Sequence, residues 1–430
     1  MSGTPPADPP ENGPAGDAFY VVHKMVPPGD PGDPIYQRRL DNPTAALNGS
    51  NWLALYRSDD AHGNPIAVSG MIVLPNQPPK TADGYPLISW AHGTVGVAHM
   101  CAPSRDRLES DAHPVNVYPQ DLLNNFLSQG WAVAMTDYEG LGVTYGRHPY
   151  MLGRSEAHGV LDIVRTAREL FGERISGRFA IVGHSQGGQA ALFAAHHAPG
   201  RVDGLVGVAA IAPANHPLDV ITGGARNPFQ DPGRGYAFTP LFLAGALGGD
   251  PRIRAEEVLS PNWAMPHWPE VDELCRAGLS KGAWGDMVGN QQFKRKGLGV
   301  LPTYPGDPNE HQGWFNEQLK EMNPNLPIGV PIRISQSADD ERVKAQTIEE
   351  EYPVVGTITV RGTDELVAEL LKTNEDCTPG LLYRRYPPND NDTDDRVPVP
   401  EHELGVHFAT INHDAPALTA WLGELFDGGG

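Results

Sequence analysis

The 430-residue sequence is poor in cysteine and in basic residues, and it has no long apolar run. Its 32 Lys and Arg are outnumbered by 53 Asp and Glu, which gives a formal net charge of -21. Such a charge would repel nucleic acid and anionic membrane surfaces, so neither is an expected partner. Because no apolar stretch could span a bilayer, we also expect no stable membrane insertion.

The three cysteines, Cys101, Cys275 and Cys377, follow no metal-binding spacing, so we expect no metal site. Their odd number permits one disulfide at most. The first residues lack a basic segment followed by an apolar one, so no signal peptide is expected within this chain. We expect a secreted or periplasmic protein whose signal has been removed, with a cytoplasmic location as the alternative.

Glycine and proline are abundant, with 49 and 42 residues, and they follow no period. A chain of this length with 40% hydrophobic residues can bury a large core. It is therefore expected to form one large domain with an insertion, or two domains. Residues 1–34 combine Pro, Gly and Asp with few large apolar side chains, which predicts an N-terminal lead-in that is flexible or lies along the surface.

The most informative motif is Gly-His-Ser-Gln-Gly at residues 183–187, between an apolar run and a helix rich in small residues. This arrangement is typical of a nucleophile elbow, a strand-to-helix turn so tight that it strains its central Ser185. Gly183 and Gly187 would be required because a Cβ at either position would collide with the adjoining strand and helix. The motif predicts Ser185 as a nucleophile, with the N–H of Gln186 as an oxyanion donor.

Alternating apolar strands and amphipathic helices predict an α/β fold with a mostly parallel sheet flanked by helices. A helix over 155–171 precedes the elbow strand, and the apolar run 204–211 is typical of a strand buried on both faces. The segments 51–56 and 65–74 predict an antiparallel hairpin at the sheet edge. We assign residues 35–212 and 330–430 to this core.

The alternation stops between residues 213 and 329, a region that contains four tryptophans. A structureless loop of that length is improbable in a domain, so we expect an inserted helical cap. If the cap is a lid over Ser185, its aromatic residues would face an apolar ester. The alternative is an insertion whose tryptophans only fill its own small core.

A serine nucleophile needs a neutral imidazole, and that imidazole needs a carboxylate to orient it. The order Ser185, acid, histidine is that of the α/β-hydrolases. The acid is expected at the end of a strand over 331–335, where Asp340 is preferred to Asp339. His407 is preferred to His413 as the base because we expect His407 in the loop before the last helix and His413 at its start.

The second oxyanion donor is expected in the loop that follows a buried strand over 86–90. In α/β-hydrolases a backbone N–H from such a loop completes the oxyanion hole. Gly93 and Thr94 are both candidates, and we interpret His92 as structural.

Taken together, the motifs resemble the secretory lipase family typified by Candida antarctica lipase A and its bacterial relatives. The resemblance covers most of the chain from about residue 50 onward, and it rests on five stretches: Ser-Trp-Ala-His-Gly-Thr-Val-Gly at 89–96, Cys-Ala-Pro-Ser at 101–104, Asp-Tyr-Glu-Gly-Leu-Gly at 137–142, Gly-Arg-Ser-Glu-Ala-His-Gly at 153–159 and Gly-His-Ser-Gln-Gly-Gly at 183–188.

The resemblance implies an α/β-hydrolase core, an inserted helical cap and ester hydrolysis by a Ser-Asp-His triad without a cofactor. The family's acid motif aligns with residues 336–343 and selects Asp340, although Ser337 stands where Gly is expected and keeps Asp339 open. The Ala-Pro and Trp-Leu pairs near the C-terminus select His407.

The family also implies a disulfide between Cys101 and Cys275, with Cys377 left over. Two segments, 344–362 and 387–403, are longer than the family leads us to expect, and they could reshape the mouth of the pocket. They bear on the preferred chain length of a substrate rather than on the reaction.

The sequence thus predicts a carboxylic ester hydrolase, an esterase or lipase, that acts on a small-molecule or lipid ester. An acyltransferase or serine peptidase using the same triad is the nearest alternative. A non-catalytic binding module on a hydrolase fold is an alternative from another class. No oligomeric state is predicted.

Overall fold

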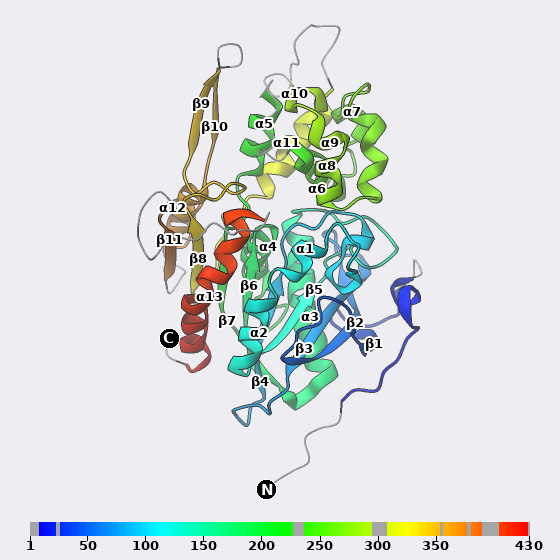
Figure 1. The fold of residues 1–430 in the computed structure, drawn as a ribbon, viewed down its shortest axis with the longest axis vertical. Coiled ribbons are helices and arrows are strands. Elements are labelled where there is room, and N and C mark those ends of the chain that lie inside the picture. Colours follow the sequence, from blue (N-terminus) through cyan, green and yellow to red (C-terminus); the bar gives the residue numbers. More distant parts are fainter. Residues whose placement is uncertain are drawn as a thin grey trace.

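A computed structural model describes residues 8–22, 26–226, 236–294, 308–352, 356–375, 380–388 and 404–428. Its centre is a nine-stranded sheet in the order β1-β2-β3-β5-β4-β6-β7-β8-β11 (Figure 1). The strands are β1 (Pro34–Arg39), β2 (Gly49–Asp59), β3 (Pro65–Pro75), β4 (Tyr85–Ala91), β5 (Ala132–Thr136), β6 (Ile175–His184), β7 (Leu205–Ile211), β8 (Ile332–Ser337) and β11 (Leu381–Tyr386); β9 (Ile348–Tyr352) and β10 (Gly356–Val360) form a separate pair.

The helices cover both faces of the sheet and form a further group beyond its upper end (Figure 1). In the core, α3 packs with α4, and α2 packs with α13. The helices are α1 (His113–Val117), α2 (Gln120–Gln129), α3 (Gly153–Phe171), α4 (Gln186–His197), α5 (Pro217–Arg226), α6 (Thr239–Gly249), α7 (Ala255–Val258), α8 (Arg276–Lys281), α9 (Ala283–Asp286), α10 (Gly289–Gln292), α11 (Glu310–Glu321), α12 (Thr363–Thr373) and α13 (Gly405–Phe426), with 3-10 helices η1 (Gly16–Tyr20), η2 (His99–Cys101), η3 (Pro103–Arg105), η4 (Gly172–Arg174), η5 (Tyr236–Phe238) and η6 (Met265–Asp272).

The predicted α/β class is confirmed by the parallel pairing of the central strands. β5, β4, β6, β7, β8 and β11 run parallel to their neighbours in this part of the sheet. The carboxyl ends of parallel strands meet at one edge, so the segments that follow β4, β6 and β8 lie at the same end of the sheet. These segments contain the predicted oxyanion loop, the elbow serine and the predicted acid.

The antiparallel hairpin forms as predicted from β2 and β3, but its expected position at the edge of the sheet was wrong. The edge strand is β1, which pairs with β2 and was not predicted. It lies beside the Pro- and Gly-rich lead-in and ends in two arginines. Charged residues are common on edge strands because they discourage pairing with another chain.

The described part of the lead-in packs against the core. Phe19 and Tyr20 are buried in a cluster that also includes Leu53 and Leu55 of β2. The Tyr20 hydroxyl donates to the carbonyl of Ser104 at 2.8 Å. A small number of apolar side chains is therefore enough to fasten residues 8–22, although their composition suggested a loose segment.

Helices α5 to α11 lie between β7 and β8 in chain order and form their own apolar cluster. Trp284 and Trp268 are buried in this cluster, so these two tryptophans fill the core of the insertion. Tyr150 and Met151 of the sheet domain belong to the same cluster, which packs the insertion onto the domain. Figure 1 shows these helices as a layer above the sheet.

The long segment 344–362 contains both strands of the β9–β10 hairpin, which was not predicted. The hairpin rises beside α5 (Figure 1) and contacts it through β10. Arg361, just after β10, forms an ion pair with Asp219 of α5 at 2.7 Å. The other long segment, 387–403, lies almost entirely outside the described residues.

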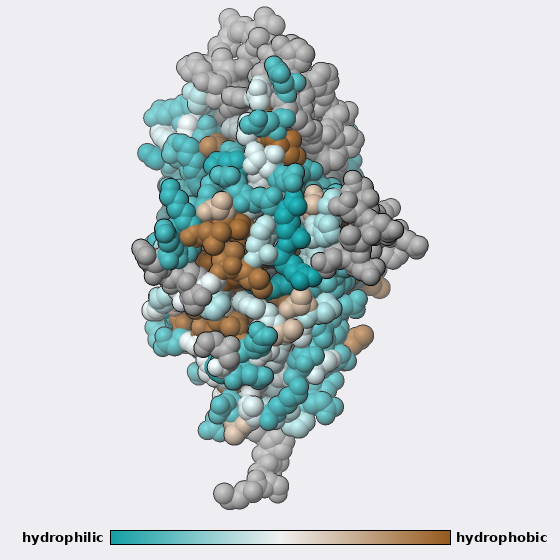
Figure 2. Space-filling view, turned by 90° about the vertical axis from the view of Figure 1, so that its left-hand side faces the viewer, coloured by the Kyte–Doolittle hydropathy of each residue, from teal (hydrophilic) through white to brown (hydrophobic). Residues whose placement is uncertain are grey.

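Figure 2 shows one face of the molecule, where an apolar area at mid-height is surrounded by hydrophilic residues. Across the described ranges, no helix is both long enough and apolar enough to cross a membrane.

Candidate active site

Ser185 lies at the junction of β6 and α4 in a strained backbone conformation. Its φ and ψ are 59° and -120°, and a positive φ is uncommon for a residue with a side chain. Backbone hydrogen bonds hold it there: its N–H donates to Ile211 at 2.9 Å, and its carbonyl accepts from Ala214 at 3.0 Å. The strand-to-helix turn predicted from the motif is therefore present, and Ser185 is partly exposed.

The glycines on both sides of the serine are required by close backbone contacts. A Cβ at Gly183 would lie 2.0 Å from the carbonyl oxygen of Gly187. A Cβ at Gly187 would lie 1.9 Å from the carbonyl oxygen of Ala91 on β4. Both distances are far below van der Waals contact. Because the two glycines have no Cβ, the first turn of α4 can pack directly against β6 and β4.

The predicted oxyanion loop lies beside the serine. A Cβ built on Gly93 would be 3.5 Å from the Cβ of Ser185. Within the described chain, the backbone N–H groups of Gly93, Thr94 and Gln186 donate to no protein acceptor. These amides are the kind of donor that can stabilise an oxyanion near the serine. The Thr94 hydroxyl is held by the Tyr150 hydroxyl at 2.8 Å.

Asp340 and His407 form a buried pair. His407 Nδ1 donates to Asp340 Oδ2 at 2.7 Å, and both side chains are almost fully buried. Burial by itself would raise the pKa of Asp340, but the nearby charge and hydrogen bond of His407 and two backbone N–H groups lower it below its usual value. This carboxylate can hold one tautomer of the imidazole and stabilise its protonated form.

His407 lies in the first turn of α13, so the prediction of a loop position before the helix was wrong. His184, the neighbour of Ser185, donates its Nε2–H to the His407 carbonyl at 3.0 Å, and the two rings are 4.5 Å apart. The backbone of His407 is thus hydrogen-bonded to the residue that precedes the serine. No hydrogen bond joins the Ser185 hydroxyl to His407 within the described chain, and such bonds are often long before substrate binds.

The alternative acid and base lie elsewhere. Asp339 is exposed, and its backbone N–H contacts Ser337 Oγ at 3.4 Å. His413 is within α13 rather than at its start, and its ring packs on Tyr386 at 4.8 Å. The geometry therefore favours Asp340 and His407 for the acid and base positions.

A buried ion pair that was not predicted from the sequence joins β8 to α13. Arg333 donates from Nη1 and Nη2 to the two carboxylate oxygens of Asp414 at 2.5 and 2.6 Å. The Ser335 hydroxyl also donates to this carboxylate, at 2.8 Å. Arg333 precedes Asp340 by seven residues, and Asp414 follows His407 by seven. Two buried contacts therefore hold α13 against β8 and the loop that follows it.

The oxyanion side has its own buried network, which sequence reasoning also missed. The amide of Gln186 donates to Glu156 Oε1 at 2.6 Å and to His148 Nε2 at 2.8 Å. His148 Nδ1 in turn donates to the Glu139 carbonyl at 2.9 Å. Both glutamates lie in stretches that carried the family resemblance, which was the available signal. The network fixes the residue whose N–H was predicted to bind the oxyanion.

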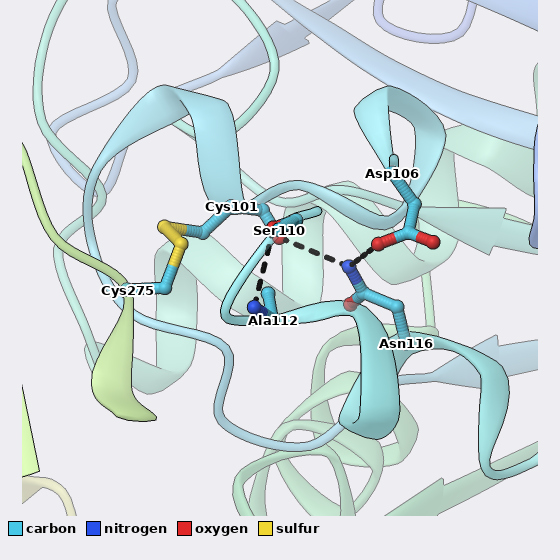
Figure 3. Close-up of a disulfide and its surroundings, with 6 residues drawn as sticks. All are labelled: Cys101, Asp106, Ser110, Ala112, Asn116 and Cys275. Atoms are coloured by element: carbon cyan, nitrogen blue, oxygen red, sulfur yellow. Dashed lines mark hydrogen bonds between the residues drawn. A yellow bond between two sulfur atoms is a disulfide. The ribbon is translucent and has the colours of Figure 1, made fainter. Parts of the chain in front are cut away.

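Cys101 and Cys275 form a disulfide, as the family resemblance implied (Figure 3). Asn116 of α1 braces the loop that carries Cys101, since its amide donates to Asp106 Oδ1 at 2.9 Å and contacts the Cys101 carbonyl at 3.5 Å. The bond attaches the helical insertion to the segment that follows the oxyanion loop. Cys377 lies outside the described residues.

Within the part of the chain that the structure describes, no group of three or more His, Cys, Asp or Glu residues could hold a metal ion.

Comparison with known proteins finds similarity to lipases. A profile of the secretory lipase family matches residues 108–220. Lipase 6 of Candida albicans is 27% identical over 286 residues, which is 63% of this chain and 56% of that protein. Lipase 7 of the same organism is 27% identical over 187 residues, covering 41% of this chain and 42% of the relative. The alignments thus span about half the length of these relatives.

Solved structures with low sequence identity share the fold. The rice cell wall degrading esterase LipA from Xanthomonas oryzae superposes with a TM-score of 0.63 at 18% identity, covering 93% of this chain and 99% of that one. Candida antarctica lipase A in its closed state gives a TM-score of 0.64 at 16% identity, covering 93% and 83%. These structures show that the chain has the fold of α/β-hydrolase lipases and esterases. The matching profile and the Candida albicans relatives show that the chain is similar to the secretory lipase family.

Proposed function

We propose that this protein hydrolyses carboxylic esters through an acyl intermediate on Ser185. The observation that carries the proposal is the buried Asp340–His407 pair, attached through His184 beside a strained elbow serine. The similarity of residues 108–220 to the secretory lipase family supports a lipid ester as the substrate.

In the proposed first step, Ser185 Oγ attacks the ester carbonyl carbon while His407 Nε2 accepts the hydroxyl proton. Asp340 keeps the Nδ1 proton of His407 in place and stabilises the imidazolium. The negative oxygen of the tetrahedral intermediate is bound by the N–H of Gln186 and that of Gly93 or Thr94. The intermediate then collapses: the alkoxide takes the proton from His407 and leaves as alcohol.

In the second step, His407 removes a proton from water, whose oxygen attacks the acyl carbon. The same amides bind the second oxyanion. Collapse returns the proton to Ser185 Oγ and releases the carboxylic acid. No cofactor takes part in either step.

The helical insertion from α5 to α11 is proposed to cover the serine as a cap. It lies beyond the carboxyl ends of the strands, and it is attached near the oxyanion loop by the Cys101–Cys275 bond (Figures 1 and 3).

A fluorophosphonate probe tests the nucleophile directly. We expect the probe to label wild type, Ser185→Ala to abolish labelling, and His407→Ala to reduce it strongly. His413→Ala, on the same helix, is the matched control and should be labelled like wild type. Absence of labelling in the folded wild-type protein would favour a binding module instead.

A panel of p-nitrophenyl esters of increasing acyl length, run beside a peptide amide substrate and an acceptor alcohol, tests the reaction. We expect ester hydrolysis to collapse in Asp340→Ala and to persist in Asp339→Ala. Rapid amide cleavage without ester cleavage would favour a peptidase, and transfer that exceeds hydrolysis in water would favour an acyltransferase.

A further inference from the structure

Arg276, the first residue of α8, lies against the oxyanion loop. Its N–H donates to the Val95 carbonyl at 2.8 Å, and a Cβ on Gly96 would be 3.1 Å from its nitrogen. The preceding residue is Cys275, whose disulfide fixes this contact (Figure 3). The insertion therefore presents an arginine close to the amides that would bind an oxyanion.

The charge of Arg276 has no carboxylate counterpart among the described residues. Its only described side-chain contact is a long one, 3.5 Å from Nη1 to the Ser280 hydroxyl. Burial lowers the pKa of its guanidinium to about 10, and the positive charge of Arg342 adds to that effect. A poorly solvated cation without a counterion is energetically unfavourable. The absence of a paired carboxylate among the described residues is notable because the chain has a net charge of -21 and therefore many acidic residues.

The charge of Arg276 acts on two groups near the candidate site, Tyr150 and Arg342. Burial raises the pKa of Tyr150, whose hydroxyl contacts Thr94, and Arg276 opposes that rise. Arg342 lies over the ring of Phe408 at 4.8 Å, next to His407. Arg276 thus belongs to the insertion where it contacts the oxyanion loop, and Arg342 belongs to the acid loop.

The two arginines differ in what already neutralises them. Arg342 Nε is 3.4 Å from Glu341, and its Nη2 donates to the Leu404 carbonyl at 3.3 Å. Arg276 is partly exposed and has no such partner among the residues described. A planar guanidinium without a counterion is complementary to a carboxylate in charge and in geometry, and it can bind the carboxylate through two parallel hydrogen bonds.

On the basis of the proposed function, we infer that the substrate class is esters that also carry a free carboxylate, such as half-esters of dicarboxylic acids, and that Arg276 binds that carboxylate. Arg276 is then a specificity-determining residue, and the disulfide sets its distance from the serine. A charge-assisted hydrogen bond contributes about 1.5–3 kcal/mol, or roughly 10- to 100-fold in specificity.

The kinetic test compares mono-p-nitrophenyl adipate with p-nitrophenyl hexanoate, which lacks the terminal carboxylate. We expect Arg276→Gln to lower kcat/KM for the adipate at least 10-fold and to change it for the hexanoate less than twofold. Arg254→Gln, an exposed arginine of the same insertion, is the control and should leave the ratio unchanged. An unchanged ratio in Arg276→Gln would overturn the inference.

A binding test makes the outcome independent of catalysis. In Ser185→Ala, calorimetry should show monomethyl adipate binding at least 10-fold more tightly than dimethyl adipate, and adding Arg276→Gln should remove that difference. Equal binding of the two probes would overturn the inference even if ester hydrolysis is found. Selective binding that depends on Arg276, without Ser185 labelling, would support the carboxylate site and reject the proposed hydrolysis.

Discussion

The two sides of Ser185 are held in place by different forces. On the elbow side, backbone atoms of β4, β6 and α4 approach so closely that only glycine fits at positions 183 and 187. On the histidine side, two buried contacts set the position of His407: the hydrogen bond from His407 to Asp340, just after β8, and the Arg333–Asp414 ion pair between β8 and α13. The first arrangement is local and steric, and the second is long-range and electrostatic. The two sides should therefore fail differently when altered.

The largest effect is expected for Gly187→Ala. The added Cβ would meet the backbone of Ala91 at 1.9 Å, where no side chain can move aside. We expect a loss of more than about 4 kcal/mol, beyond the usual range for single substitutions, or no folded protein. The control is Gly177→Ala on β6, the strand that leads into the elbow, where a Cβ has no neighbour within 4 Å. Urea unfolding of both variants checks this, and similar stabilities would contradict the steric account.

The next largest effect is expected on the catalytic rate of the Asp340→Asn variant. An amide cannot hold the same histidine tautomer, so kcat for a p-nitrophenyl ester should fall about 10⁴-fold. Asp339→Asn should remain near wild type. A small rate loss in Asp340→Asn would mean that another group orients His407.

The pKa of Asp340 is lowered in the folded state, so its stabilising contribution is present above the pKa of the unfolded chain and is lost as pH falls through the folded value. The unfolding free energy of wild type relative to Asp340→Asn should therefore shrink as pH drops below about 4. Urea titrations at pH 7, 5, 4 and 3 measure this, and a constant difference would contradict it.

Asp414→Ala should destabilise the protein by about 3–5 kcal/mol, because it leaves Arg333 buried without its partner. It should also lower kcat more than it changes KM, since the ion pair positions α13 rather than substrate. Glu317→Ala removes the exposed pair with Lys320 and should cost less than about 1 kcal/mol. If the two variants were equally stable, the histidine side would not depend on its ion pairs.

The smallest effect concerns Glu139, on the elbow side. Burial raises its pKa from 4.5 to about 7, so the folded protein keeps a proton that the unfolded chain releases. Stability should therefore fall as pH rises from about 4.5 to 7, by roughly 3 kcal/mol at most. Glu139→Gln should remove this fall, as measured by unfolding at pH 5 and pH 8. Parallel pH curves for wild type and variant would contradict the assignment.

The contrast between the two sides also explains what the sequence could predict. The elbow was predictable because Gly183, Ser185 and Gly187 are adjacent in sequence and their spacing alone encodes the turn. The Arg333–Asp414 pair spans 81 residues, and no local pattern indicates it. The insertion was predicted to be helical because the alternation of strands and helices stops there. Most of its individual helices were not predicted, since the apolar cluster that they share forms only in the folded chain.

The sequence placed the start of α13 too late, near His413. Here the helix begins at Gly405, and Pro416 lies within it. Phe408 and Ile411 are buried in the core, and this burial offsets the backbone hydrogen bond that Pro416 cannot donate. The choice of His407 from the family pattern still led to a residue that pairs with Asp340, although the reason from helix position was wrong.

The Cys101–Cys275 bond closes a loop of 174 residues that contains the elbow itself. In a chain-entropy estimate, opening such a loop in the unfolded state costs about 5 kcal/mol of stability. A reducing cytosol, or dithiothreitol in a purification buffer, would therefore yield a weaker protein whose insertion is no longer tethered. The choice of expression compartment thus decides how much of the native architecture survives. The presence of this disulfide agrees with a protein that works outside the cell.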